Sequence, residues 1–326
     1  MLNLKIGNLL RKKNKKIALV TGGAGFIGSH MVDLLLLKGF EVRVIDNLST
    51  GHLKNFKHNK KNKNFKFKNI DICKLSRYDI FFKNVNYVFH FAGIADLIPS
   101  IERPQDYLMT NTQGTIKILE ASRFNKVKKF LYAASASCYG MTSKPVSENS
   151  KIKIEHPYAL SKYLGEKAAF HWNKVYGLPV NSIRIFNAYG PRSRTSGAYG
   201  AVIGVFFKQK IANKPLTVVG DGKQSRDFIY VSDLVKAFLS AAETKISNRI
   251  YNAGTGKSQK VLYLAKLVGG KISYLPDRPG EARRSCANIL KIKRELKWTP
   301  KVKFEDGIKI MLEQIHRWKN APLWTP

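Results

Sequence analysis

The sequence predicts an α/β protein built on a parallel sheet, and three observations support this. An apolar run at residues 17–20 leads into a glycine-rich turn at 21–28, and a helical pattern of apolar residues follows. Further short apolar runs alternate with helical patterns as far as residue 185. Such alternation is typical of parallel strands joined by right-handed helical crossovers. The predicted fold class is therefore a Rossmann-type doubly wound sheet with a smaller α/β lobe for the substrate.

The glycine-rich turn indicates a dinucleotide site. Gly22 and Gly25 permit a tight turn and close approach of the backbone to a pyrophosphate, and Gly28 lets the next helix pack on the strand. Phe26 and Ile27 begin that helix, whose free N–H groups attract anions. The spacing is G-x-x-G-x-x-G, and the alternative interpretation is a glycine-rich loop without a ligand.

A second strand is expected at residues 41–45, ending at Asp46. An acidic residue about 20 positions after such glycines accepts hydrogen bonds from the adenosine ribose and repels a 2′-phosphate. Asp46, followed by Asn47, therefore favours NAD over NADP. The alternative is that Asp46 only caps a loop.

The next elements place further residues at the cofactor. The expected elements are strands at 65–70, 85–93 and 129–134 and a helix at 105–124. Asp71 follows the first of these strands and is expected to accept the exocyclic amine of the adenine, while Ile72 packs on the ring. Ala92 is one of the small residues that end the next strand and admit the cofactor, and Asn111 on the helix is assigned to the same site.

A catalytic group is expected where the 129–134 strand ends. Ser135 follows this strand, and Pro157 is suited to open a later helix. Tyr158 and Lys162 are four positions apart and share one face of that helix. The lysine ammonium and a positive nicotinamide ring are expected to lower the pKa of Tyr158, with Ser135 holding the same substrate oxygen. Tyrosine and lysine at this spacing are common by chance, so the interpretation depends on the dinucleotide pattern before them.

Eight motifs occur in an order that resembles the extended short-chain dehydrogenase/reductase family. They are TGGAGFIG at 21–28, DNLSTG at 46–51, NTQGT at 111–115, YALSK at 158–162, RIFNAYGPR at 184–192, GDGKQSRDFIYVSD at 220–233, NAGTG at 252–256 and RPGE at 278–281. The resemblance covers residues 16–300. Within the family, the chain resembles the NAD-dependent sugar-nucleotide epimerase/dehydratase branch, and in that branch it is most similar to the UDP-glucose and UDP-N-acetylglucosamine 4-epimerases.

The resemblance implies that Ser135, Tyr158 and Lys162 catalyse epimerisation at C4 of a nucleotide-linked hexose through a transient 4-keto sugar. In the related 4,6-dehydratases an Asp-Glu pair follows the serine, and the decarboxylases commonly carry a glutamate nearby. Here Ala136 and Ser137 follow it, and neither offers a proton of suitable pKa. Dehydratase, decarboxylase or reductase activity is the enzymatic alternative, and a non-catalytic NAD-binding sensor is the alternative from another class.

The resemblance also implies a site for the sugar nucleotide, expected to be UDP-linked, and a homodimer. Asn187, Arg226 and Arg278 would hold the diphosphate, since forked guanidinium groups suit phosphate oxygens. Ser285, seven positions after Arg278, would line the sugar pocket and leave room for an N-acetyl group. The alternatives are that the arginines are surface charges and that Ser285 faces a loop.

The expected organisation has a flexible basic leader at 1–15, with a weak surface-binding helix as the alternative. An NAD-binding domain is expected at 16–185 plus 229–250, and a sugar-nucleotide domain at 186–228 plus 251–326.

Composition excludes several other classes of protein. Of the 326 residues 44% are hydrophobic, which indicates a globular core, and no apolar run reaches the roughly 18 residues of a membrane span. The three cysteines follow no disulfide or zinc pattern, so we expect no metal and a cytoplasmic location. The net charge is +35, but the lysines are spread along the chain and no nucleic-acid motif is present. Specific nucleic-acid binding is therefore not expected.

Overall fold

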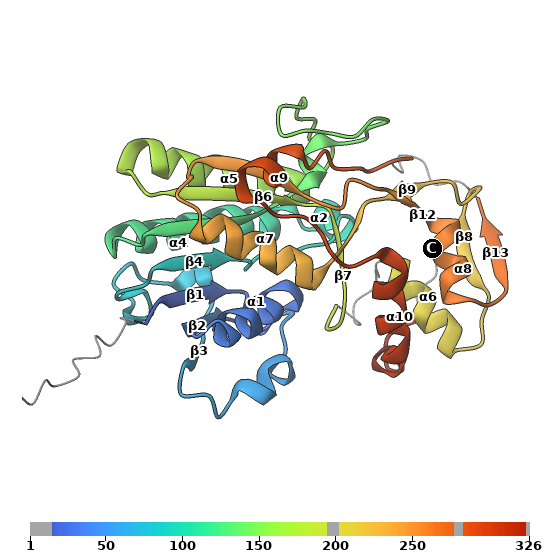
Figure 1. Cartoon of the computed structure of the whole chain (residues 1–326), viewed down its shortest axis with the longest axis horizontal. Helices are drawn as coiled ribbons and strands as arrows, with labels where there is room; N and C mark the ends of the chain where they lie inside the picture. Colours follow the sequence, from blue (N-terminus) through green and yellow to red (C-terminus); the bar gives the residue numbers. More distant parts are fainter. Residues whose placement is uncertain (1–14, 194–201, 277–282, 324–326) are drawn as a thin grey trace, which may run out of the picture.

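The computed structural model describes residues 15–193, 202–276 and 283–323, and Figure 1 shows their arrangement. Seven parallel strands form the main sheet in the order β11-β6-β5-β4-β1-β2-β3. They are β1 (Ile17–Thr21), β2 (Glu41–Asp46), β3 (Phe65–Asn69), β4 (Tyr87–His90), β5 (Lys129–Ser135), β6 (Val180–Ile185) and β11 (Arg249–Ala253). The strand order reverses between β1 and β4, which opens a crevice at the carboxyl ends of the strands.

Helices cover both faces of the sheet. One core joins the sheet to α1 (Phe26–Leu37), α7 (Val231–Glu243) and α9 (Leu290–Leu296), and another joins it to α4 (Gly114–Phe124) and α5 (Pro157–Tyr176). Successive strand residues serve opposite cores, since Val20 lies in the first and Leu19 in the second. The predicted doubly wound Rossmann-type fold is confirmed.

The helix expected at 105–124 is interrupted. α2 (Ile98–Glu102) and α3 (Pro104–Leu108) lead into a π-helical turn, η4 (Met109–Gln113), before α4 begins. Asn111 lies in this turn and is fully buried, and its carbonyl accepts a hydrogen bond from Thr115 Oγ1 at 2.6 Å. Such turns commonly occur at functional sites, where they redirect one side chain.

The remaining elements form a smaller lobe, on the right of Figure 1. Its helices are α6 (Val202–Ile211), α8 (Val261–Val268), α10 (Phe304–Glu313) and the short η6 (Ile315–Trp318). Its strand pairs are β8 (Leu216–Val219) with β13 (Ile272–Leu275), β7 (Asn187–Tyr189) with β10 (Phe228–Tyr230), and β9 (Ser225–Arg226) with β12 (Gln259–Lys260). A separate core that includes Phe206, Phe207 and Trp318 holds this lobe together.

The structure changes two expected boundaries. β11 belongs to the main sheet and ends at Ala253, so the sheet continues beyond the boundary expected at residue 250. The chain also returns to the main lobe at α9, where Ile292 and Trp298 enter the same core as Val20. The cause is the apolar face of α9, which packs against β11 and α7.

Short 3₁₀ helices lie in several of the segments that follow the strands. They are η1 (Leu53–Asn59), η2 (Ile72–Lys74), η3 (Ile80–Phe82) and η5 (Ala136–Tyr139). β4 is shorter than the strand expected at 85–93, because residues after His90 leave the sheet. Within the described ranges, no helix has the length and apolar character needed to cross a membrane.

Candidate active site

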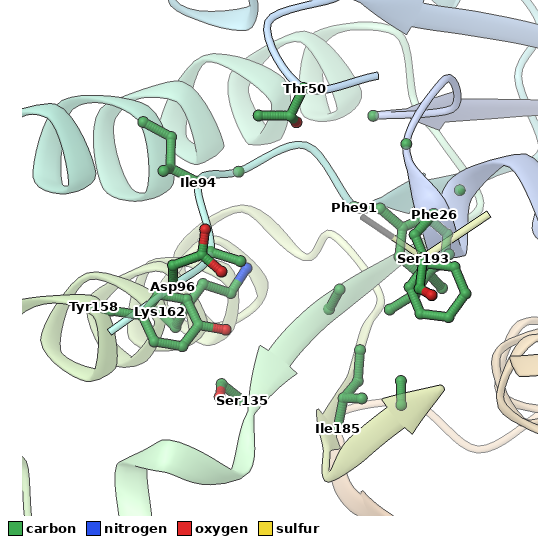
Figure 2. Close-up of a pocket in the computed structure, with 18 of the residues that line it drawn as sticks. Phe26, Thr50, Phe91, Ile94, Asp96, Ser135, Tyr158, Lys162, Ile185 and Ser193 are labelled. Atoms are coloured by element: carbon green, nitrogen blue, oxygen red, sulfur yellow. The ribbon is translucent and has the colours of Figure 1, made fainter. Parts of the chain in front are cut away.

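A cavity of about 1070 Å³ lies at the carboxyl ends of the strands and extends to the smaller lobe. Figure 2 shows part of its wall. The residues expected from the sequence that line it are Gly22, Gly25, Phe26, Ile27, Gly28, Asp46, Asn47, Asp71, Ile72, Ala92, Ser135, Tyr158, Lys162, Asn187, Arg226 and Ser285. Asn111 is not among the lining residues, and Arg278 lies outside the described part of the chain.

The glycine-rich turn has the geometry that the sequence indicates. Gly22 has a φ of +68°, and a Cβ there would lie 2.6 Å from the backbone nitrogen of Ala92. A Cβ at Gly28 would overlap the carbonyl oxygen of Gly22. Gly25 precedes α1 and supplies no side-chain cap, so the first N–H groups of the helix are left for a ligand. These residues fit the diphosphate of a dinucleotide.

Asp46 stands at the end of β2 with its carboxylate held in place. Its Oδ2 accepts from the Ala24 N–H at 2.9 Å and its Oδ1 accepts from the Leu48 N–H at 2.8 Å. Burial raises the pKa of Asp46, and these two hydrogen bonds oppose that rise. Asn47 Nδ2 donates to Asp71 Oδ2 at 3.0 Å, which joins the ends of β2 and β3. The arrangement suits the adenosine end of the cofactor.

The three residues expected to be catalytic lie along one side of the cavity (Figure 2). Ser135 is the last residue of β5, and Tyr158 lies in the first turn of α5. His156 caps this helix by accepting from the Ala159 N–H at 3.2 Å. The Lys162 ammonium lies 4.6 Å from the centre of the Tyr132 ring, one helical turn beyond Tyr158.

The surroundings of Tyr158 and Lys162 oppose their charged forms. Burial raises the pKa of Tyr158, the hydrogen bond with Ser135 partly offsets this, and the charge of Asp96 raises it further. Burial lowers the pKa of Lys162 to about 8, against the opposing charge of Glu166. The expected lowering of the Tyr158 pKa is therefore not produced by the protein groups. An oxidised nicotinamide ring bound in the cavity would supply a positive charge that favours the phenolate.

Asp96 and Glu155 also line the cavity and were missed at the level of sequence. Asp96 has a left-handed φ of +86°. The loop before it is fixed by Asn111, whose Oδ1 accepts from the Ile94 N–H at 2.7 Å and whose Nδ2 donates to the Ile94 carbonyl at 2.9 Å. Tyr107 Oη donates to the neighbouring Ala95 carbonyl at 2.7 Å. Asn111 thus shapes the cavity wall from behind, and no local pattern in the sequence reveals this.

The wall from the smaller lobe is built around the buried Asp227. Its carboxylate accepts from the Gly256 and Ala287 N–H groups, both at 3.0 Å. Next to it, the Ser285 N–H donates to the Ser225 carbonyl at 2.9 Å. This pairing brings Ser285 beside β9, whose Arg226 also lines the cavity.

The parallel sheet, the glycine-rich turn and the cavity at the switch point define a dinucleotide-binding protein. Residues 18–254 match the model of the NAD dependent epimerase/dehydratase family. The chain belongs to this family, and the NAD-dependent type of enzyme expected from the sequence is confirmed.

Similar proteins have related names. A Methanocaldococcus jannaschii protein, provisionally named a UDP-glucose 4-epimerase, is 38% identical over 89% of this chain and 95% of its own. A UDP-N-acetylglucosamine 4-epimerase from Methanobrevibacter ruminantium, solved with UDP-N-acetylmuramic acid, has a TM-score of 0.86 at 32% identity. A UDP-glucuronic acid 4-epimerase from Bacillus cereus, solved with UDP-glucuronic acid and NAD, has a TM-score of 0.85 at 31% identity. Each structural match covers 92% of this chain and 99% of the other.

Proposed function

We propose that the chain is a UDP-sugar 4-epimerase. The observation that carries this proposal is the environment of Ser135. Ala136 and Ser137 follow it in η5, where the Ser137 N–H donates to Ser135 Oγ at 3.1 Å. Neither residue is an acid or base of the kind that water elimination needs next to the serine. The names of the similar proteins support the same activity.

NAD bound in the cavity would supply a reversible hydride acceptor for C4 of the sugar, and the residues of the chain handle the proton. Tyr158, as phenolate, takes the proton of the C4 hydroxyl, and Ser135 holds the same oxygen. The resulting 4-keto sugar turns within the cavity and presents its other face, and Tyr158 then returns the proton to the oxygen. The cycle is redox-neutral, so it consumes no cofactor.

Product analysis tests this reaction. The enzyme is incubated separately with UDP-glucose, UDP-N-acetylglucosamine and UDP-glucuronate, and the products are resolved by chromatography. We expect the C4 epimer without net formation of NADH. A 4-keto-6-deoxy product, release of CO2 or consumption of added NAD would contradict the proposal. The first two outcomes would assign the acid chemistry to Asp96 or Glu155, which line the same cavity. Absence of turnover with every UDP-sugar would favour an NAD-binding sensor.

We further propose that Tyr158, Lys162 and Ser135 are the catalytic residues and that Asn187, Arg226 and Arg278 hold the diphosphate of the substrate. Asn187 and Arg226 line the cavity on the side of the smaller lobe, as this role requires. Tyr158 lines the same cavity, which supports the proposal that one sugar nucleotide contacts both groups.

Ser285 is expected to set the size of the sugar pocket. Changing Ser285 to Tyr places an aromatic ring in the cavity wall, and we expect activity on UDP-N-acetylglucosamine to fall about tenfold or more. Activity on UDP-glucose is expected to stay within about threefold, because the plain hexose lacks the acetamido group. Steady-state kinetics with both substrates measure the ratio.

Ser273→Tyr is the matched control, since Ser273 is exposed on β13 and lies outside the cavity wall. Its kinetics should equal those of the unchanged enzyme. An equal loss on both substrates in Ser285→Tyr would show that residue 285 does not discriminate between them.

A cytoplasmic homodimer completes the proposal. The cysteines Cys73, Cys138 and Cys286 are free, as in a reducing compartment. Leu160 and Leu164 on α5 are each 37% exposed one helical turn apart, which offers an apolar stripe to a second copy. Sedimentation velocity at micromolar concentration checks the dimer, and a monomer there would contradict it.

A further inference from the structure

A turn of the smaller lobe packs directly on α1. Residues 190–193 follow β7, and a Cβ on Gly190 would lie 3.7 Å from the Phe26 ring. His30 Nε2 donates to the Pro191 carbonyl at 2.9 Å. Phe26 is the first residue of α1, and both Phe26 and Ser193 line the cavity. The turn therefore contacts side chains along the first turns of α1, the helix whose N-terminal N–H groups suit a cofactor diphosphate.

Arg192 in this turn is held by one edge of its guanidinium. Its Nη2 lies 2.7 Å from Asp33 Oδ2 on α1. Asp33 Oδ1 is itself fixed, because it accepts from His58 Nε2 at 2.7 Å and from Asn59 Nδ2 at 2.6 Å. Arg192 also has a left-handed φ of +66°, which an arginine adopts only at a cost. The local structure thus fixes the direction of this side chain.

The second terminal nitrogen of the guanidinium, Nη1, makes no hydrogen bond to any residue that the structure describes. It is buried and belongs to a side chain that lines the cavity. The same wall holds Arg317 and Trp318, and the buried Trp318 Nε1 also has no hydrogen-bond partner in the described ranges. Burial lowers the pKa of His30, and the charges of Arg192 and Arg317 lower it further. These side chains can only donate hydrogen bonds, so this part of the wall fits an anionic acceptor.

We propose that Arg192 donates a hydrogen bond to a phosphate oxygen of a nucleoside diphosphate bound in the cavity, and that Asp33 positions it. The cavity offers two sources of such a group, the cofactor and the sugar nucleotide. The neighbouring start of α1 assigns Arg192 to the diphosphate of the cofactor. This inference rests on the NAD site and is independent of the proposed epimerisation.

Binding measurements on the whole chain separate the two sources. Isothermal titration calorimetry measures the Kd values of three ligands. ADP-ribose carries the diphosphate of the cofactor, adenosine lacks it, and UDP carries the diphosphate of the sugar nucleotide. For Arg192→Gln we expect the Kd of ADP-ribose to rise at least about tenfold, as for loss of a charge-assisted hydrogen bond. The Kd values of adenosine and UDP should change less than twofold. Arg192→Lys keeps the positive charge but replaces the planar guanidinium with a single ammonium group, so it should give an intermediate Kd for ADP-ribose.

Arg294→Gln is the matched control, because Arg294 also pairs with a carboxylate, Glu295 at 3.3 Å, and lies outside the cavity wall. It should bind all three ligands unchanged. Asp33→Asn should also raise the Kd of ADP-ribose, because Arg192 loses the carboxylate that positions its side chain. An unchanged ADP-ribose Kd in Arg192→Gln, a loss confined to UDP, or an equal loss of adenosine and ADP-ribose would each overturn the proposal.

Discussion

Tyr158→Phe is expected to lower kcat by about 10³-fold, the usual range for loss of an acid–base group. The change removes only the phenolic oxygen. The ring keeps its stacking on His156, at 6.0 Å between centroids, and its edge contact with Tyr107 at 6.3 Å. The cavity wall should therefore keep its shape, and the Kd of NAD should stay within about twofold. Product formation and cofactor titration measure the two quantities separately.

Tyr263→Phe serves as the control for this prediction. Tyr263 also carries a hydrogen-bonded hydroxyl, donating to Glu305 Oε1 at 2.8 Å, but it lies outside the cavity wall. Its kcat should remain unchanged. If Tyr158→Phe keeps more than about a tenth of the activity, another group moves the proton, and Asp96 in the same wall becomes the candidate.

Arg184→Met is expected to lower the free energy of unfolding by about 3–5 kcal/mol. The Arg184 and Glu166 side chains are 3% and 2% exposed, and Nη2 lies 2.6 Å from Oε1. Burial opposes the charge of Arg184, yet the hydrogen bond and charge of Glu166 raise its pKa. Removing the guanidinium leaves a buried carboxylate that keeps the hydrogen bond from Ser182 Oγ at 2.8 Å. Urea denaturation followed by circular dichroism gives the free energy.

Two further variants make this stability prediction specific. Arg294→Met removes an arginine that is 73% exposed and should change stability by less than about 0.5 kcal/mol. The double variant Arg184→Met with Glu166→Leu removes both buried charges and should recover much of the loss. If the double variant is less stable than Arg184→Met alone, Glu166 stabilises the fold by interactions other than its ion pair with Arg184.

Local signals in the sequence predicted the local geometry of the proposed cofactor site. The turn around Gly22 needs a left-handed backbone, Asp46 ends a strand, and Tyr158 and Lys162 share one helix face. Each of these features depends on neighbours within a few positions. Such features can therefore be recognised in the sequence from a periodic pattern or a fixed spacing of residues.

The other features depend on contacts between distant segments. Asn111 redirects its helix because its side chain binds the loop at Ile94, 17 positions earlier. Arg192 meets Asp33 only after the smaller lobe has packed on α1. Likewise, α9 returns to the main lobe because its apolar face fits β11 and α7. Contacts between segments that are distant in the chain leave no local pattern in a single sequence, so they could not be predicted from it.

Asp227 has a consequence for how this enzyme can evolve. One carboxylate ties together backbone groups at Thr255, Gly256 and Ala287, so the strand-like segment carrying Ser285 keeps its register through main-chain contacts. The anchoring bonds of this segment that the structure describes involve its backbone N–H groups. With the role proposed for Ser285, substrate range can diverge by exchange of this one side chain, whereas an inserted or deleted residue nearby would disturb the backbone contacts of Asp227.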